Sequence, residues 1–301
     1  MATVWGSFRR WGVDNLKQHL PEILLEASRL LTLPDGSNRN IISLLDTADI
    51  SQRSGRTRKE IDILALEQSI VPERYIRNMD ALSMKDQITL LQSRVCIVGL
   101  GGLGGSVVET LARIGIGAMT VIDGDIFDES NLNRQVLSSE HNLSQTKTAA
   151  ALEKILTVNS SILIQDYSEK MDEENAVHLL EHADIAVDCL DNIQARFILE
   201  KAAKKAGIPM VSAAVAGFSG QITAIFPEDR GLELVYGPEQ SLSATRGAET
   251  TLGNLAFTVS LVASLECAEV VKILLNKDSD LRNQLLIVDL KEPTFERIRL
   301  L

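Results

Sequence analysis

Cysteine is scarce in this 301-residue chain, and its spacing fits neither a disulfide framework nor a cysteine-rich metal site. The three cysteines, Cys96, Cys189 and Cys267, are dispersed, and no Cys-x-x-Cys pair occurs. Disulfide-stabilised secreted domains are small and dense in cysteine. Residues 1–10 contain no apolar segment of the kind found in secretory signals. We therefore expect a reduced, cytoplasmic protein.

Basic charge and uninterrupted apolar runs are also lacking. Lys and Arg number 30 against 41 Asp and Glu, which gives a formal net charge of −11. This balance offers no general attraction to nucleic-acid backbones or anionic membranes, although it leaves a local basic cleft open. The most apolar long stretch, residues 252–275, contains Glu266, Glu269 and Lys272, which predicts a buried helix rather than a membrane span. We expect neither a membrane nor a nucleic-acid partner.

The chain divides into two parts by its sequence pattern. Helical patterns cover residues 14–31 and 59–70, and polar, turn-rich sequence covers residues 33–40 and 51–59. The segment 51–59 is basic and resembles a mobile linker. We therefore expect a small helical N-terminal extension over residues 1–72 and a separate domain over residues 73–301.

The second part alternates between apolar strands and helices. Short apolar runs occur at residues 95–98, 119–122, 162–165, 185–188 and 210–213, with helical segments at 103–114, 147–158, 173–181 and 192–206 between them. Strand and helix in alternation predict an α/β fold with a doubly wound, mostly parallel sheet. Such Rossmann-like sheets bind ligands at the carboxyl ends of their strands.

A glycine-rich loop follows the first of these strands. Gly99, Gly101 and Gly104 satisfy the pattern G-x-G-x-x-G, with Gly102 as an additional glycine. Glycines at this turn let the backbone approach a nucleotide closely, and the following helix N-terminus favours anions. Asp123 ends the next strand, where its carboxylate can accept hydrogen bonds from ribose hydroxyls. A dehydrogenase has the same pattern, and a tight turn without a ligand is a further alternative.

A polar run after Asp123 separates these alternatives. It contains the sequence Asn131-Leu132-Asn133-Arg134-Gln135, followed by Lys147 and later by the acidic pair Asp188 and Asp191. A nicotinamide enzyme needs no pair of cations and second carboxylate beside its glycine loop. Adenylation does need them, because Arg and Lys stabilise the charge that develops on the leaving pyrophosphate and a carboxylate holds Mg²⁺.

These motifs, in this order, resemble the MoeB/ThiF/HesA family, bacterial relatives of ubiquitin-activating enzymes. The resemblance covers residues 73–301 and includes the segment Arg74-Tyr75-Ile76-Arg77. It implies an adenylyltransferase that uses ATP and Mg²⁺ to activate the C-terminal carboxylate of a small ubiquitin-like sulfur carrier ending in Gly-Gly. The implied roles are ribose binding by Asp123, phosphate contacts by Asn131, Arg134 and Lys147, support of these contacts by Gln135, Mg²⁺ binding by Asp191, and entry of Arg77 into the partner's ATP site in a homodimer.

The chain departs from the family pattern in its cysteines. Many relatives carry two Cys-x-x-Cys pairs for a structural zinc, and neither pair is present here, so we expect no zinc. The loop at residues 247–253, where some relatives hold a reactive thiol, also lacks cysteine. Cys96 and Cys267 lie in apolar segments and are predicted core residues. Cys189 is the only candidate thiol near the crevice, and we expect no catalytic role for it.

Several other functions are compatible with the same motifs. One is adenylation of a different carboxylate, on a peptide, a free acid or a modified tRNA base; the acidic composition argues against the tRNA substrate. Another is a non-catalytic partner subunit, against which the joint presence of Arg77, Asp123, Arg134, Lys147 and Asp191 argues. The sequence identifies neither the carrier nor the pathway.

Overall fold

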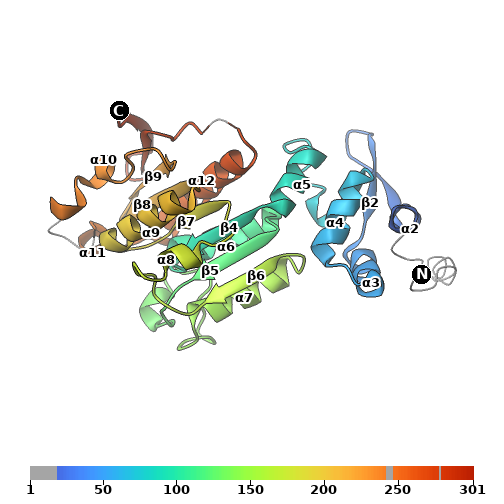
Figure 1. Cartoon of the computed structure of the whole chain (residues 1–301), viewed down its shortest axis with the longest axis horizontal. Coiled ribbons are helices and arrows are strands. Elements are labelled where there is room, and N and C mark those ends of the chain that lie inside the picture. Colours follow the sequence, from blue (N-terminus) through green and yellow to red (C-terminus); the bar gives the residue numbers. More distant parts are fainter. Residues whose placement is uncertain (1–18, 242–246, 278) are drawn as a thin grey trace. The chain divides into compact units, whose positions relative to one another are not determined.

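The computed structural model describes residues 19–241, 247–277 and 279–301. The chain forms two compact units, Met1–Leu91 and Gln92–Leu301. The first unit therefore extends beyond the boundary between residues 72 and 73 that the sequence suggests. Figure 1 shows both units and labels most of the elements with the names used below.

The N-terminal unit combines helices with a small sheet, so it is not the purely helical extension that the sequence predicts. Its strands β1 (Arg29–Thr32), β2 (Asn38–Ile42) and β3 (Ile70–Pro72) lie in the order β1-β2-β3, and its helices are α2 (Leu20–Ala27), α3 (Leu44–Ser54), α4 (Arg58–Glu67) and α5 (Met84–Gln92), with the 3₁₀ helix η2 (Glu73–Tyr75). Strand β1 replaces the end of the predicted helix because residues 33–37 form a turn that lets it pair antiparallel with β2.

The segment predicted as a mobile linker, residues 51–59, consists of the end of α3, a tight turn and the start of α4. Helix α3 ends at Gly55, whose φ of 69° is in the left-handed region that glycine tolerates best. Helix α4 begins three residues later, at Arg58, and is preceded by a capping box in which Thr57 and Glu60 each accept a hydrogen bond from the other's backbone amide. The helices enclose an aliphatic core that includes Ile23, Leu24 and Ile61.

The C-terminal unit is the doubly wound α/β domain that the sequence predicts. Its eight strands lie in the order β11-β10-β9-β8-β7-β4-β5-β6. The strands β4 (Arg94–Val98), β5 (Ala118–Ile122), β6 (Leu163–Tyr167), β7 (Ile185–Asp188) and β8 (Met210–Ala216) are parallel, and β9 (Ser219–Ile225), β10 (Gln284–Asp289) and β11 (Thr294–Arg299) add antiparallel pairs at one side.

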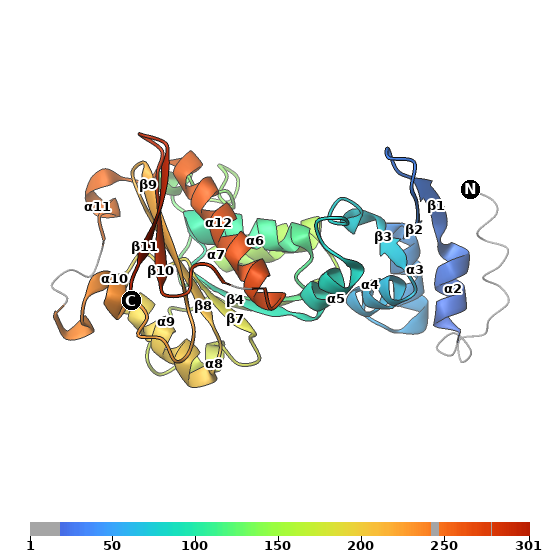
Figure 2. The same cartoon turned by 90° about the horizontal axis from the view of Figure 1, so that it is seen from above.

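Helices cover both faces of this sheet. Figure 2 shows α6 (Gly102–Ile114), α7 (Lys147–Val158) and α12 (Ala256–Leu274) on one side and α8 (Ala176–Leu179) and α9 (Ile193–Ala206) on the other. Short helices α10 (Glu233–Tyr236) and α11 (Glu249–Leu252) and the 3₁₀ helices η3 (Glu129–Asn131) and η4 (Glu239–Ser241) lie in the connections. In the described residues, no helix has both the length and the hydropathy that a bilayer span needs.

The strand order places a crevice at the centre of the sheet. From β4 the chain continues outward through β5 and β6, and then returns to the other side of β4 for β7 and β8. The loops after β4 and β7 therefore leave the sheet side by side toward opposite faces. Ligands of doubly wound folds bind at this switch point, beyond the carboxyl ends of the strands.

Candidate functional site

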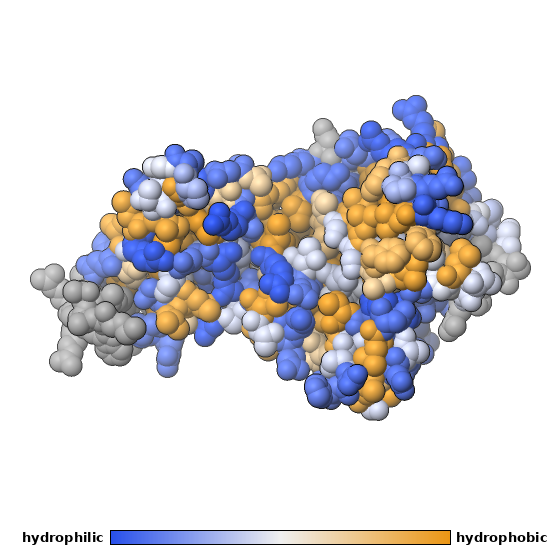
Figure 3. Space-filling view, turned by 180° about the vertical axis from the view of Figure 1, so that it is seen from behind, coloured by the Kyte–Doolittle hydropathy of each residue, from blue (hydrophilic) through white to orange (hydrophobic). Residues whose placement is uncertain are grey.

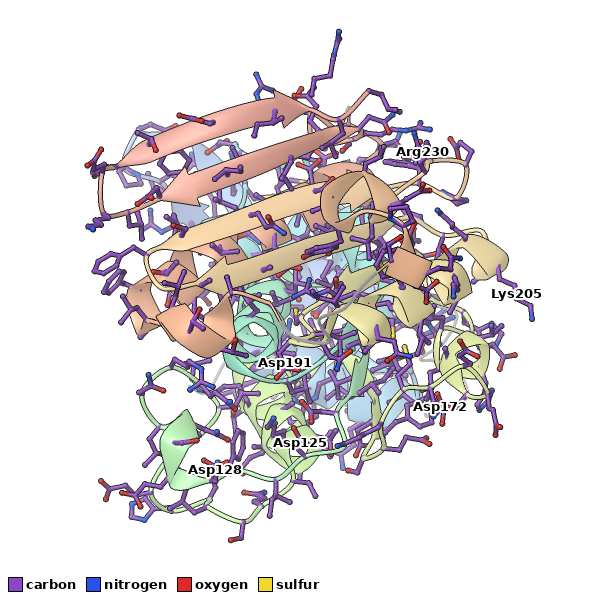
Figure 4. All side chains as sticks on the ribbon, turned by 90° about the vertical axis from the view of Figure 1, so that its left-hand side faces the viewer. Asp125, Asp128, Asp172, Asp191, Lys205 and Arg230 are labelled. Carbon is purple, nitrogen blue, oxygen red and sulfur yellow. The ribbon has the colours of Figure 1, made fainter. Side chains whose placement is uncertain are left out.

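A cavity of about 630 Å³ lies at this switch point. Its volume is in the usual range of small-molecule sites. Loops after β4, β5, β6 and β7 and the start of α12 form its walls; Figure 4 views this part of the molecule and labels Asp125 and Asp191, which both line it. The polar lining residues with side-chain charge or amide groups are Asp123, Asp125, Arg134, Gln135, Lys147, Glu169, Lys170, Asp191, Asn192, Gln194, Arg196 and Asn254.

The glycine loop forms one wall of the cavity, and two of its residues must be glycine because the backbone there is packed too closely for side chains. Gly99 has a φ of 89°, and a Cβ there would lie 2.7 Å from the carbonyl oxygen of Cys189. A Cβ on Gly104 would lie 1.8 Å from the carbonyl oxygen of Gly99. Gly99, Gly101 and Gly102 line the cavity, and α6 begins at Gly102, so its N-terminus opens there. This combination favours an anionic ligand such as a phosphate group.

Asp123 connects the glycine loop to the next strand. Its Oδ2 accepts a hydrogen bond from the backbone amide of Leu100 at 2.7 Å, and its Oδ1 accepts one from the amide of Asp125 at 2.8 Å. The carboxylate is therefore held at the cavity wall in one orientation. Carboxylate oxygens have further lone pairs, so it can still accept ribose hydroxyls.

The two predicted cations reach the cavity from different segments. Lys147 is the first residue of α7, and its Nζ lies 3.1 Å from Asp125 Oδ2 and 3.6 Å from Asp123 Oδ2. Arg134 donates from Nη1 to the backbone oxygen of Ser130 at 3.0 Å and to Asn133 Oδ1 at 2.8 Å. The structure thus brings Asp123, Arg134 and Lys147 together around one space.

Gln135 and Asn131 are both buried, but only Gln135 lines the cavity. Gln135 is 6% exposed and lines the cavity, and its Oε1 has no hydrogen-bond partner among the described residues. A buried polar atom without a partner is unfavourable, so this amide indicates a place where a polar ligand fits. Asn131 is buried but absent from the lining. Its amide instead forms a capping box with Asp128, so its predicted phosphate contact stays a prediction.

The acidic pair after β7 divides into a buried and an exposed member. Asp188 is fully buried; its Oδ2 accepts hydrogen bonds from Arg196 Nη1 at 2.9 Å and from Ser212 Oγ at 2.6 Å. Arg196 also donates to the backbone oxygens of Leu190 and Ala213. This network fixes the loop that holds Asp191, whose exposed carboxylate lines the cavity. Asp191 is therefore the acid available to a ligand or cation.

Cys189 lies in the same loop but is a buried, neutral thiol. Its Sγ donates to Glu266 Oε2 at 3.7 Å. Burial and the neighbouring Glu266 and Asp188 raise the pKa of Cys189 well above its usual value. Burial, followed by the charge of Asp188, also raises the pKa of Glu266. The thiolate that covalent catalysis requires is thus disfavoured at this position.

A second cavity, of about 240 Å³, shares four lining residues with the first: Asp191, Arg196, Ala214 and Val215. Its other walls come from β8, β9 and the region of α10, and include Gly220, Gln221 and Tyr236. Gln221 Nε2 donates to the Tyr236 hydroxyl at 2.9 Å. Sequence reasoning missed both this cavity and Arg196. One feature of the sequence could have identified Arg196 as a candidate, because it is a charged residue among the apolar positions of a helix.

Arg77 belongs to the N-terminal unit. It is an exposed residue in the turn that follows η2. Exposure leaves its guanidinium accessible to a second molecule.

The doubly wound sheet, the glycine loop at its switch point and the converging cations and carboxylates define a Rossmann-like nucleotide-binding protein. Over residues 74–300 the sequence matches the ThiF family. The chain belongs to the ThiF family and is an adenylyltransferase of the ubiquitin-activating type.

Named relatives agree with this family. The chain is 31% identical to the SAMP-activating enzyme E1 of Haloferax volcanii over 228 residues, which are 75% of this chain and 84% of that protein. It is also 31% identical to the molybdopterin-synthase adenylyltransferase of Haemophilus influenzae, over 72% of this chain and 89% of that protein. The adenylyltransferase and sulfurtransferase MOCS3 of Xenopus laevis is 31% identical over 75% of this chain, which spans about half (51%) of that relative.

Solved structures confirm the fold. A crystal structure of E. coli MccB with ATP has a TM-score of 0.64 at 22% identity and matches 84% of this chain and 82% of its own. The crystal structure of PaaA has a TM-score of 0.62 at 22% identity and matches 81% of this chain and 82% of its own.

Proposed function

We propose that this adenylyltransferase activates the C-terminal carboxylate of a small ubiquitin-like sulfur carrier ending in Gly-Gly, using ATP and Mg²⁺. The observation that supports this most is the pair of cavities that meet at Asp191 and Arg196. The larger, charged cavity suits a nucleoside triphosphate. The smaller cavity suits a slender acyl chain whose carboxylate reaches the shared wall. Relatives named as SAMP-activating E1 and molybdopterin-synthase adenylyltransferase support the choice of substrate.

The reaction joins the two ligands at that wall. A carboxylate oxygen of the carrier attacks the α-phosphorus of ATP, the bond to the β,γ-pyrophosphate breaks, and the products are an acyl adenylate and pyrophosphate. Both Arg134 and Lys147 are fixed before the reaction, by hydrogen bonds and ion pairs respectively. Cations that are already oriented stabilise the charge of the leaving pyrophosphate with little reorganisation.

A magnesium ion fits the residues at the shared wall. Asp191 offers an exposed carboxylate. The described residues contain no group of three or more His, Cys, Asp or Glu side chains arranged as a metal site, so the other ligands of the ion would come from outside the protein. Mg²⁺ commonly takes one or two carboxylates and completes its shell with waters and substrate phosphates. When bound, it would neutralise phosphate charge, while Asp191 would hold it beside the substrate.

The proposal includes a homodimer in which Arg77 enters the partner's ATP site. Supporting this, the C-terminal unit exposes a group of apolar residues near the start of α12. Phe257 is 52% exposed and packs against the ring of Phe218 at 5.5 Å between centroids, and Leu252 is 63% exposed. Figure 3, which views the molecule from behind, shows apolar surface on the C-terminal unit. Exposed apolar groups of this kind commonly mark protein contacts.

The test is ATP–pyrophosphate exchange with purified protein and Mg²⁺. We expect exchange only when a carrier ending in Gly-Gly is added, and calorimetric binding of ATP but not of NAD. A carrier lacking its last glycine is the matched control and should give background exchange. Exchange that needs no acyl partner, exchange with an unrelated acid only, or tight binding of NAD would each overturn the proposal.

A further inference from the structure

The loop that holds Arg134 and Gln135 is closed at its base by paired backbone segments. The amide of Phe127 donates to the carbonyl of Gln145 at 3.0 Å, and the amide of Ser144 donates to the carbonyl of Phe127 at 2.9 Å. One residue pair further out, the amide of Lys147 donates to the carbonyl of Asp125 at 3.1 Å. Asp125 and Lys147 therefore stand opposite one another where the loop leaves and rejoins the domain.

Their side chains repeat this contact. Lys147 Nζ lies 3.1 Å from Asp125 Oδ2, closer than its 3.6 Å separation from Asp123 Oδ2. Asp123 already accepts two backbone amides, from Leu100 and from Asp125 itself. Asp125 is thus the principal side-chain acceptor for the ammonium. Lys170 lies 3.8 Å from the other oxygen of Asp125, but it is 82% exposed, so this ion pair contributes little.

Lys147 needs such an acceptor because little water reaches its side chain. Its side chain is only 9% exposed, and it is the first residue of α7. Burial removes water from the ammonium, and the helix dipole places partial positive charge at the same end. Without Asp125, the ammonium keeps only the longer contact with Asp123, at 3.6 Å, and the long side chain gains rotamer freedom. A carboxylate at 3.1 Å holds it against the cavity.

We propose that Asp125 is a positioning residue that orients the Lys147 ammonium toward the phosphates and fastens the base of the Arg134 loop. The inference rests on the proposed use of this cavity for ATP, and Asp125 acts on the nucleotide through Lys147. The negative charge of Asp125 also repels phosphate, which is an effect of opposite sign. An experiment can distinguish the two effects, because Asp125 can orient the ammonium only if Lys147 is present, whereas it repels phosphate whether or not Lys147 is present.

The experiment is a double-mutant cycle read by calorimetry with ATP and Mg²⁺. Asp125→Ala removes the acceptor and should weaken ATP binding about tenfold, as expected for a lost hydrogen bond to a charged group. Asp125→Asn keeps an oxygen for Nζ and should stay within about threefold of the wild type. In a Lys147→Ala background, Asp125→Ala should no longer weaken ATP binding, because only the repulsion of phosphate is left to relieve. Glu129→Ala removes an exposed acid of the same loop and is the control for charge alone.

Two results would overturn this role. A loss that persists in the Lys147→Ala background would show that Asp125 acts through general structure, and tighter or unchanged ATP binding by Asp125→Ala would show that repulsion dominates. If Asp125→Ala does not fold, Asp125→Ser, which also cannot reach Nζ, repeats the cycle. Failure of the wild type to bind ATP would overturn the proposed function itself. This result is distinguishable from failure of the role of Asp125, because the latter appears only in the variants of a protein that does bind ATP.

Discussion

The two units differ in where they bury charge. Among the charged residues that are buried in the described segments, Asp62 is in the N-terminal unit, and Lys147, Asp188, Arg196, Glu200, Glu266 and Glu269 are in the C-terminal unit. The sequence shows the same asymmetry: residues 1–91 hold as many acids as bases, so the entire net charge of −11 resides on residues 92–301.

This difference indicates which unit performs the chemistry. A buried charge loses its hydration and persists only where other groups compensate, so clusters of buried charges are frequent at functional sites. In the C-terminal unit, Lys147 and Arg196 line the cavities, and Asp188 and Glu266 contact the lining residues Arg196 and Cys189. Glu200 and Glu269 are paired away from the cavities, with Lys204 and Lys272. The N-terminal unit is stabilised by aliphatic packing and helix capping, and its candidate residue, Arg77, is exposed. An exposed arginine contributes to a reaction only if another molecule surrounds it.

The largest expected effects lie in the C-terminal cavity. Arg134→Ala or Lys147→Ala should slow adenylation by a factor of a hundred or more, because each removes an oriented cation whose contribution is roughly 3 kcal/mol. Asp191→Asn should abolish Mg²⁺-dependent turnover. Exchange rates measured beside thermal unfolding separate lost chemistry from lost folding. Near-normal rates in all three variants would mean that the charged cavity is not the reaction site.

The next prediction examines whether the N-terminal unit contributes to the site of a second molecule. Arg77→Ala and Asp191→Asn should each be inactive alone. Mixed and allowed to exchange subunits, they should recover up to about a quarter of the wild-type activity, because half of the dimers are mixed and each has one intact site. Subunit exchange is checked with an affinity tag on one variant. Exchange without recovered activity, or full activity of a wild-type monomer, would exclude the shared site.

Much of the C-terminal unit was predictable from the sequence, because the features that define it are formed by residues close together in the chain. Strand and helix alternation follows hydrophobic periodicity, and the glycine loop is set by backbone geometry at Gly99 and Gly104, so both are visible in a single sequence. Strands β1, β2 and β3 were not predicted, because they depend on pairing with one another. The Arg196 network was missed for the same reason: its partners are brought together only by the sheet.

The smallest expected effect concerns cysteine chemistry. Cys189→Ser should leave adenylation within about twofold of the wild type, because burial and the nearby carboxyl groups raise the pKa of Cys189 and keep the thiol neutral. A raised pKa means that the thiolate forms only at strongly alkaline pH, so the rate should show no thiol titration between about pH 6 and pH 8. Metal analysis of the same protein should find no stoichiometric zinc, since the sequence has no Cys-x-x-Cys pair. A carrier thioester trapped at Cys189, or one zinc per chain, would contradict this. Lys147→Ala changes another buried residue that lines the same cavity, and its expected effect is a hundredfold loss, so comparing the two variants tests whether burial or charge determines the contribution to catalysis.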